Sequence, residues 1–369
     1  MRSSDMRITD IRTQCFRQPM VPIHQKRFAG EQEIVLTVVE SDSGHEGYAM
    51  ARAHGGQPGR GISDAILCTI RPRLLGMDPL DHERAWQSMM ALEPAGYVPV
   101  FAISAVDVAL WDLAGKIRGE SLHKMLGGRR NRIQAYASCA AMDSIDDYVR
   151  DMQRSLARGY RAYKIHPFDV PERDIELCRA LRREAGDGVA LMLDVAKNYD
   201  YAGAVKVGRV LEELGFAWFE EPLPQYDIAG YARLCRELDI PVIGAETVAG
   251  SCHSVANYLN ANALDRVLCD VYWKAGVTGM VKTAQLCEAH GVAVASHHGA
   301  SPLMNFANLH VLCGATDADM IEVLVPEEGY NFALKSYLAP DPDGFIAVPD
   351  APGIGVELDW EYLRANAVA

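Results

Sequence analysis

The sequence predicts an α/β protein, with a TIM-type barrel preceded by a smaller α+β domain. From residue 133 onward, eight short apolar runs alternate with amphipathic stretches, which is the pattern of βα units around a parallel sheet. The length of 369 residues suits a barrel of roughly 200–250 residues with a smaller companion. Polar residues end most of the apolar runs, and a barrel of this type carries its chemistry at those strand ends.

The first domain is expected to span residues 1–125 and to combine strands with helices. Two strand-like runs and two helical stretches are assigned in it, namely Arg7–Phe16, Glu33–Glu40, Ser63–Leu75 and Ile103–Ile117. The segment Pro19–Gly30 between the two strands is rich in turn-forming and polar residues, which indicates a loop.

The barrel is expected to span residues 126–325. Its strands are assigned to the apolar runs Ile133–Cys139, Ala162–His166, Val189–Val195, Ala217–Glu221, Val242–Glu246, Val267–Val271, Val292–His297 and Met320–Leu324. Between them, Ser144 can cap a helix and Pro171 can open one. A doubly wound open sheet is the competing architecture, but the sequence has no GxGxxG phosphate loop. Residues 326–369 are rich in Pro, Gly and Asp and are expected to pack back on the first domain.

The composition indicates a protein that acts on small molecules. A net charge of -13 argues against a nucleic-acid surface, which needs clustered Lys and Arg. The chain has neither the apolar leader of a signal peptide nor a run long enough to span a membrane, so we expect a cytoplasmic protein that binds no membrane. Its nine cysteines form no CxxC pair and are interpreted as reduced thiols.

Three evenly spaced carboxylates, Asp194, Glu220 and Glu246, stand at or near the ends of three consecutive predicted strands. Neighbouring strands lie about 4.8 Å apart, so the three charges would repel each other unless a cation lies between them. Oxygen ligands favour Mg²⁺, with Mn²⁺ as a substitute. The alternative for any one of these acids is a salt bridge or a helix cap.

Candidate acid and base groups stand on the other strand ends. Lys164 and His166 are two residues apart and therefore face the same side of a strand, with His166 as the candidate base and Lys164 as the cation for a substrate carboxylate. Asp270 and His297 end adjacent strands and can form a dyad. Glu322 is either a protonated donor to an enolate oxygen or an ordinary interior carboxylate. A structural role for either histidine is the alternative.

This set of residues suits removal of a proton next to a carboxylate. The enediolate that results is unstable unless a metal ion and a lysine bind the carboxylate oxygens as charge develops. A metal-dependent hydrolase on the same barrel would use a His-x-His on the first strand, where this chain has Ile133–Cys139 without histidine. A barrel that only binds a metabolite is a remote alternative, since fold alone does not fix function.

The ordered set resembles the enolase superfamily, in particular its mandelate racemase-like subgroup. The segment Asp107-Val-Ala-Leu-Trp-Asp112, followed by Leu126-Gly127-Gly128, resembles the helix that leads into the barrel of that family. The resemblance implies a modified (β/α)7β barrel and self-association into a homo-oligomer. It also implies residue roles: Mg²⁺ ligands at Asp194, Glu220 and Glu246, an acid/base dyad at Asp270 and His297, and assistance to the intermediate from Glu322.

The sequence departs from the family pattern at a few positions. The second strand has Lys-x-His where many members have Lys-x-Lys, which concerns His166. Ala196 stands where members often have a substrate-contacting Asn, and Asn198 is the candidate replacement. The segment around His24, Lys26 and Arg27 and the stretch from Arg52 to Gly59 resemble mobile loops that close over substrate in that family. His24, Lys26 and Arg27 are candidate contacts for an acid sugar, and a solvated basic loop is the alternative.

Dehydration of an acid sugar to a 2-keto-3-deoxy acid is the activity that the resemblance favours. A racemase or epimerase of a 2-hydroxy acid would use the same two bases without elimination. A cycloisomerase of a sugar-acid lactone would expel a ring oxygen in place of hydroxide. All three activities share the same first half-reaction, so the sequence leaves them open.

Overall fold

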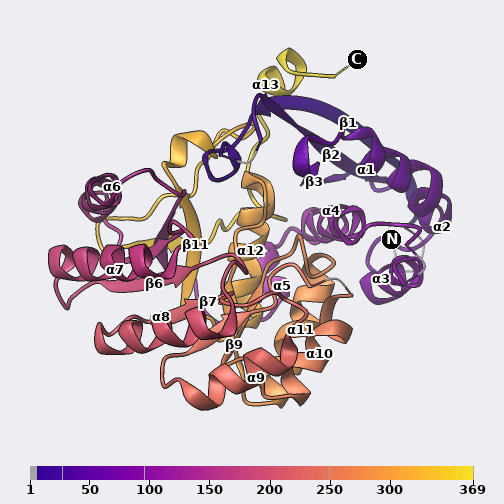
Figure 1. The fold of residues 1–369 in the computed structure, drawn as a ribbon. Helices are drawn as coiled ribbons and strands as arrows, with labels where there is room; N and C mark the ends of the chain where they lie inside the picture. Colours follow the sequence, from indigo (N-terminus) through magenta and orange to yellow (C-terminus); the bar gives the residue numbers. More distant parts are fainter. Residues whose placement is uncertain (1–5, 27, 95, 249, 369) are drawn as a thin grey trace.

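The computed structural model describes residues 6–26, 28–94, 96–248 and 250–368. Figure 1 shows a layer of N-terminal strands and helices that lies beside a barrel. The N-terminal strands β1 (Ile8–Pro19), β2 (Glu31–Ser41) and β3 (Glu46–Arg52) form an antiparallel sheet in the order β1-β2-β3. Strand β3 was not predicted from the sequence, because its glycine and two alanines have weak strand propensity. The strand forms because its backbone pairs antiparallel with β2.

Helices follow this sheet along the chain. They are α1 (Arg60–Asp64), a π-helical turn (Ala65–Ile70), α2 (Arg71–Leu74), α3 (His82–Met90), α4 (Val100–Arg118) and α5 (Leu122–Met125). Helix α4 packs against β2 and β3. It is buried along most of its length, because it contacts both β3 and the barrel helix α11 (Gly276–Ala289). At Gly47, on β3, an added Cβ would lie 1.9 Å from the carbonyl oxygen of Ala109, so the sheet and the helix touch backbone to backbone there.

The barrel contains eight parallel strands with one helix between each consecutive pair. The strands are β4 (Arg132–Cys139), β5 (Ala162–Ile165), β6 (Ala190–Asp194), β7 (Trp218–Glu220), β8 (Val242–Gly244), β9 (Arg266–Cys269), β10 (Ala293–Ser296) and β11 (Met320–Val325). The helices are α6 (Ile145–Ala157), α7 (Pro171–Ala185), α8 (Tyr201–Glu213), α9 (Ile228–Glu237), α10 (Ser251–Asn260), α11 (Gly276–Ala289) and α12 (Pro302–Ala315). In the described chain, β11 leads into a short 3-10 turn (Glu327–Gly329) and not into an eighth barrel helix. The expected (β/α)7β barrel is therefore confirmed.

Two local signals in the barrel act as the sequence predicts. The Ser144 hydroxyl accepts a hydrogen bond from the backbone N–H of Asp147 at 3.2 Å and so caps α6. Pro171 is the first residue of α7, where its missing N–H costs nothing. Strands β5 to β10 end slightly earlier than the apolar runs suggested, so several functional residues lie just past the strand ends.

The barrel is closed between β10 and β11 by hydrogen bonds that involve side chains. That order runs β10-β9-β8-β7-β6-β5-β4-β11, which leaves β10 and β11 as the two ends. Across this join, the Ser296 hydroxyl accepts from the backbone N–H of Glu322 at 3.2 Å, and the Tyr136 hydroxyl donates to the Ser296 carbonyl at 2.7 Å. Tyr136 and Trp218 pack edge to face in the buried interior.

The C-terminal segment contacts both the barrel and the first sheet. Strand β12 (Phe345–Ala347) pairs antiparallel with β4 of the barrel. Beyond α13 (Trp360–Ala365), the backbone N–H of Val368 donates to the Cys15 carbonyl on β1 at 2.9 Å. Figure 1 shows this end of the chain above the N-terminal sheet.

Helices α3 and α4 of the first domain form hydrogen bonds with the segment that follows β9. The Asp107 carboxylate on α4 accepts from the backbone N–H and the hydroxyl of Thr278, at 2.9 and 2.7 Å. The Trp86 indole on α3 donates to the Ala275 carbonyl at 2.9 Å. These contacts seat the first domain on the side of the barrel that carries β9. No helix in the described part of the chain is long and apolar enough to cross a membrane.

The close contact between β3 and α4 predicts that a larger residue at Gly47 destabilises the protein. Gly47→Ala should lower the free energy of unfolding by about 1–3 kcal/mol, because the new methyl group overlaps backbone atoms of α4 that cannot move aside. The matched control is Gly61→Ala in α1, where a Cβ meets nothing within 4 Å. Thermal unfolding monitored by circular dichroism measures both variants, and equal midpoints would contradict the prediction.

Candidate active site

A cavity of about 440 Å³ lies at the carboxyl ends of the barrel strands, where the predicted site residues gather. Residues of the first domain contribute to it, including His24 and Lys26 from the loop after β1 and Arg52 from the end of β3. The barrel residues that line it include Lys164, His166, Asp194, Lys197, Glu246, Thr247, Trp273, His297, His298 and Glu322. Both domains therefore enclose the site.

The three predicted metal ligands converge in this region. One carboxylate oxygen from each of Asp194, Glu220 and Glu246 lies within 4.8 Å of the other two. Asp194 and Glu220 are the last residues of β6 and β7, whereas Glu246 follows the end of β8. Burial and the neighbouring Asp194 carboxylate raise the pKa of Glu220 well above its usual range, although Lys164 opposes this. The site thus has an excess of negative charge, which a divalent cation with oxygen ligands would fit.

Lys164 lies at the centre of the buried charges. Its ammonium is 2.7 Å from Glu220 Oε1, 2.9 Å from Glu322 Oε1 and 3.4 Å from Asp194 Oδ2, and the side chain is 1% exposed. Burial disfavours the charged form, but these carboxylates outweigh it and raise the pKa of Lys164 well above its usual value. Lys164 therefore remains a cation and is not suited to be a neutral base.

His166 lies on the β5 side of the carboxylates. Its Nδ1 is 2.7 Å from the Cys139 carbonyl oxygen, so Nδ1 carries the hydrogen and donates. Its Nε2 lies 2.9 Å from Asp194 Oδ2 and belongs to the cavity wall. The carbonyl contact therefore leaves Nε2 as the atom that can take up a proton.

The predicted dyad forms on the other side. His297 Nδ1 is 2.6 Å from Asp270 Oδ2, and His297 Nε2 is 3.2 Å from Glu246 Oε1. Burial lowers the pKa of His297, but Glu246 and Asp270 outweigh it and raise that pKa to about 9. The other Asp270 oxygen accepts from the backbone N–H of Trp273 at 2.6 Å, so the carboxylate that orients the imidazole is itself held in place.

Glu322 is an ionised carboxylate in this arrangement. Burial raises its pKa, but Lys164 and His297 outweigh burial and lower the pKa to about 2. Of the two forms considered from the sequence, the lowered pKa favours the ionised interior carboxylate over the protonated donor. Its Oε2 also accepts from the backbone N–H of His298 at 2.7 Å, which ties β11 to the end of β10.

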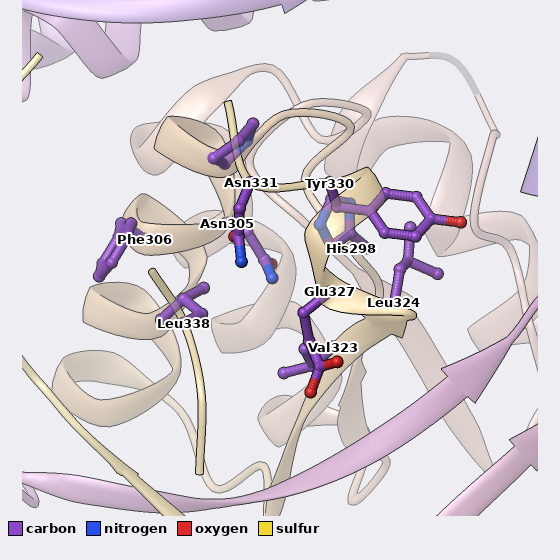
Figure 2. A pocket seen from close by; sticks show the side chains of 10 residues that line it. His298, Asn305, Phe306, Val323, Leu324, Glu327, Tyr330, Asn331 and Leu338 are labelled. Atoms are coloured by element: carbon purple, nitrogen blue, oxygen red, sulfur yellow. The ribbon is translucent and has the colours of Figure 1, made fainter. Parts of the chain in front are cut away.

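His298 also lines the active-site cavity, although alternation along a regular strand would turn it away from the side that His297 faces. Alternation fails there because β10 ends at Ser296. Figure 2 shows His298 beside Tyr330, where a second cavity of about 20 Å³ lies next to Asn305 and Glu327. Burial lowers the pKa of His298 to about 3, so the ring is neutral near pH 7.

The structure separates the four candidate substrate contacts. His24 and Lys26 line the cavity, and the Lys26 ammonium also binds Asp143 Oδ1 at 2.8 Å. Asn198 is exposed, and its neighbours Ala196 and Lys197 line the cavity in its place. The positive φ angles of Ala196 and Lys197, 45° and 72°, turn this segment in a way that strand alternation does not describe. Arg27 lies outside the described residues.

Sequence reasoning missed several residues that form or support the site. Arg52 was noted only as part of a stretch expected to form a mobile loop, and Lys197, between the compared positions Ala196 and Asn198, was not singled out. Trp218 donates its indole N–H to Glu220 Oε2 at 2.9 Å from within β7. Trp218 could have been found from the sequence, because it stands two residues before Glu220 and therefore faces the same side of the strand.

Known families match both halves of the chain. Residues 8–127 match the model described as the N-terminal domain of mandelate racemase and muconate lactonizing enzyme, and residues 147–362 match the model described as enolase C-terminal domain-like. The chain belongs to the mandelate racemase-like subgroup of the enolase superfamily. It is an enzyme, as the strand-end residues predicted.

Named relatives of this enolase-superfamily enzyme act on acid sugars. An arabinonate dehydratase of Saccharolobus solfataricus is 30% identical, over 88% of this chain and 87% of that protein. A 3,6-anhydro-α-L-galactonate cycloisomerase of Streptomyces coelicolor is 32% identical, over 91% of this chain and 92% of that protein. A structure of D-glucarate dehydratase from Agrobacterium tumefaciens complexed with magnesium has a TM-score of 0.89 at 30% identity, over 99% of this chain and 100% of that chain.

Removal of one carboxylate tests the metal site. Glu220→Gln keeps the shape of the side chain but removes a charged ligand, so we expect Mn²⁺ affinity to fall by more than the roughly 10–100-fold that a change outside the ligand set causes. Isothermal titration calorimetry of the metal-free protein with Mn²⁺ measures this. Glu213→Gln, on the exposed surface of α8, is the control and should bind like the parent. Equal affinity in both variants would remove Glu220 from the ligand set.

Proposed function

We propose that this enzyme is a Mg²⁺-dependent dehydratase that converts an acid sugar to a 2-keto-3-deoxy acid. One observation carries the proposal. The carboxylate triad lies between two histidines, with His166 Nε2 against Asp194 on one side and His297 Nε2 against Glu246 on the other. A substrate carboxylate held at the triad would present its α-carbon to one ring and its β-hydroxyl to the other.

Asp194, Glu220 and Glu246 are the residues that would hold the ion, since their oxygens converge and their combined charge calls for a cation. When bound, Mg²⁺ would supply the positive charge that stabilises negative charge developing on the substrate carboxylate. Lys164 adds a fixed cation beside the same position, and its burial keeps water from screening it. The proposal includes the expectation from the sequence that Mn²⁺ can bind in place of Mg²⁺.

The two histidines divide the proton transfers. His166 Nε2 takes the α-proton, and the electrons of the broken C–H bond pass into the enediolate. His297 then donates the proton on Nε2 to the β-hydroxyl, the C–O bond breaks, and water leaves. The enol that remains tautomerises to the 2-keto-3-deoxy acid. Asp270 holds His297 Nδ1 throughout, so the ring keeps its orientation.

A lactone cycloisomerase is the second candidate, because a relative named D-galactarolactone cycloisomerase is 28% identical over 97% of this chain. The first proton transfer would be the same, and a ring oxygen would leave in place of hydroxide. The two reactions are distinguished by whether the substrate is open or cyclic.

Proton NMR in D₂O identifies the reaction directly. The enzyme with Mg²⁺ is incubated with a panel of acid sugars and their lactones, and both the α-proton signal and product signals are followed. We expect loss of the α-proton signal together with new 2-keto-3-deoxy signals for at least one open acid sugar. Product from a cyclic substrate alone would favour the cycloisomerase, and exchange without elimination would favour a racemase or epimerase.

His297→Asn separates the two proton transfers. We expect dehydration to slow by roughly 10²–10⁴-fold, the usual contribution of a general acid, while exchange of the α-proton through His166 continues. The same NMR assay measures both rates in one sample. His290→Asn, at the exposed end of α11, is the control. Unchanged dehydration in His297→Asn would show that another group is the acid.

A further inference from the structure

Glu246 differs from the other two candidate ligands in how its backbone is held. Asp194 and Glu220 are strand residues, whereas β8 ends at Gly244, two residues before Glu246. Between them, Ala245 has a φ of 65°, in the left-handed region that non-glycine residues rarely adopt. The sheet ladder therefore does not fix Glu246, and other groups must hold this peptide in place.

On the N–H side, the holding group is a buried carboxylate. Glu221 Oε1 accepts from the backbone N–H of Glu246 at 3.1 Å. The other Glu221 oxygen lies 2.5 Å from the Lys197 ammonium, which in turn reaches the Thr247 hydroxyl at 3.2 Å. Burial and the nearby Glu246 raise the pKa of Glu221 to about 7, and Lys197 opposes that rise.

On the carbonyl side, the holding group is a buried ammonium. Lys274 Nζ donates to the Glu246 carbonyl at 2.7 Å and to the Ala245 carbonyl at 2.5 Å. Lys274 is 0% exposed and is not among the described residues that line the active-site cavity. The backbone of Glu246 is thus held by the Glu221 carboxylate at its N–H and by the Lys274 ammonium at its carbonyl.

The Lys274 backbone is itself fixed in the turn after β9. Its N–H donates to the Asp270 carbonyl at 3.2 Å, and its carbonyl accepts from the Ser251 hydroxyl at 2.9 Å. The next residue, Ala275, accepts from the Trp86 indole of the first domain. The ammonium therefore projects from a rigid base that both domains hold.

Burial of the Lys274 ammonium costs free energy that a neutral side chain of similar size would not cost. Moving a charge out of water costs free energy that packing alone does not return, and only strong hydrogen bonds to the charged form offset it. Among the described residues, the Lys274 ammonium donates to the carbonyls of Ala245 and Glu246, in the strained segment that carries the Glu246 carboxylate. Lys274 does not suit the role of a base, because its ammonium is enclosed and faces carbonyl oxygens.

We propose that Lys274 is a positioning residue that sets the Glu246 carboxylate for the metal ion. The proposal rests on the proposed function in one respect, namely that the triad holds a divalent cation. Lys274 acts through the backbone of Glu246 and does not touch the ion or the substrate. It differs in this from Lys164, which lies among the carboxylates themselves.

Metal affinity tests this role without any substrate. Lys274→Met removes the charge and both hydrogen bonds, and Lys274→Gln keeps a hydrogen-bond donor without the charge. We expect Mn²⁺ to bind Lys274→Met 10–100-fold more weakly than the parent, as for other changes just outside a ligand set, with Lys274→Gln in between. Calorimetry gives the affinity, and the electron paramagnetic resonance spectrum of bound Mn²⁺ should change in Lys274→Met. Lys206→Met, on the exposed face of α8, is the control.

The outcomes separate the two proposals. A parent protein that binds no Mn²⁺ would overturn the proposed metal function and this inference with it. A parent that binds Mn²⁺, with Lys274→Met and Lys274→Gln binding within threefold of it, would overturn the inference alone. Circular dichroism at the titration temperature shows whether each variant is folded. Failure of both variants to fold would make Lys274 a general structural requirement and would also overturn the positioning role.

Discussion

The buried ion cluster around Lys164 is the interaction on which the rest of the structure depends. Its ammonium contacts carboxylates from β6, β7 and β11, so strands distant in the sequence must end at one place. Charges removed from water are tolerable only when they are paired closely, and a closed parallel barrel brings several strand ends together in this way. The cluster leaves a surplus of negative charge, and that surplus is what makes the site suitable for a divalent cation.

Strand ends that carry chemistry lose the ladder hydrogen bonds that hold a sheet together, and side chains replace them here. Asn308 on α12 accepts from the N–H of Val271 and donates to the carbonyl of His297, at 2.7 and 3.0 Å, and so links His297 to the residue that follows Asp270. Asn305 donates to the carbonyl of Glu322 at 3.0 Å. Buried amides of this kind orient catalytic groups without adding charge.

The first domain contributes to the site in two ways. Its loop and the end of β3 supply His24, Lys26 and Arg52 to the cavity wall, so side chains of both domains line the cavity. Its helix α3 bonds to the turn after β9, which carries Asp270 and Lys274, and its helix α4 bonds to the first turn of α11. A change in how the two domains pack would therefore reach the dyad and the metal ligands through this turn. Exclusion of water from such a cavity strengthens every electrostatic contact within it.

The sequence by itself determined the (β/α)7β barrel and the strand-end residues, because apolar runs report burial and a parallel barrel fixes where their ends meet. It also identified the family to which the chain belongs. Only the tertiary structure decided which side chains support the site. Lys274 and Asn308 have no local pattern that marks them, since their partners lie far away in the chain. The ionisation of Glu322 and the inward position of His298 likewise depend on neighbours and backbone turns that alternation along a strand does not encode.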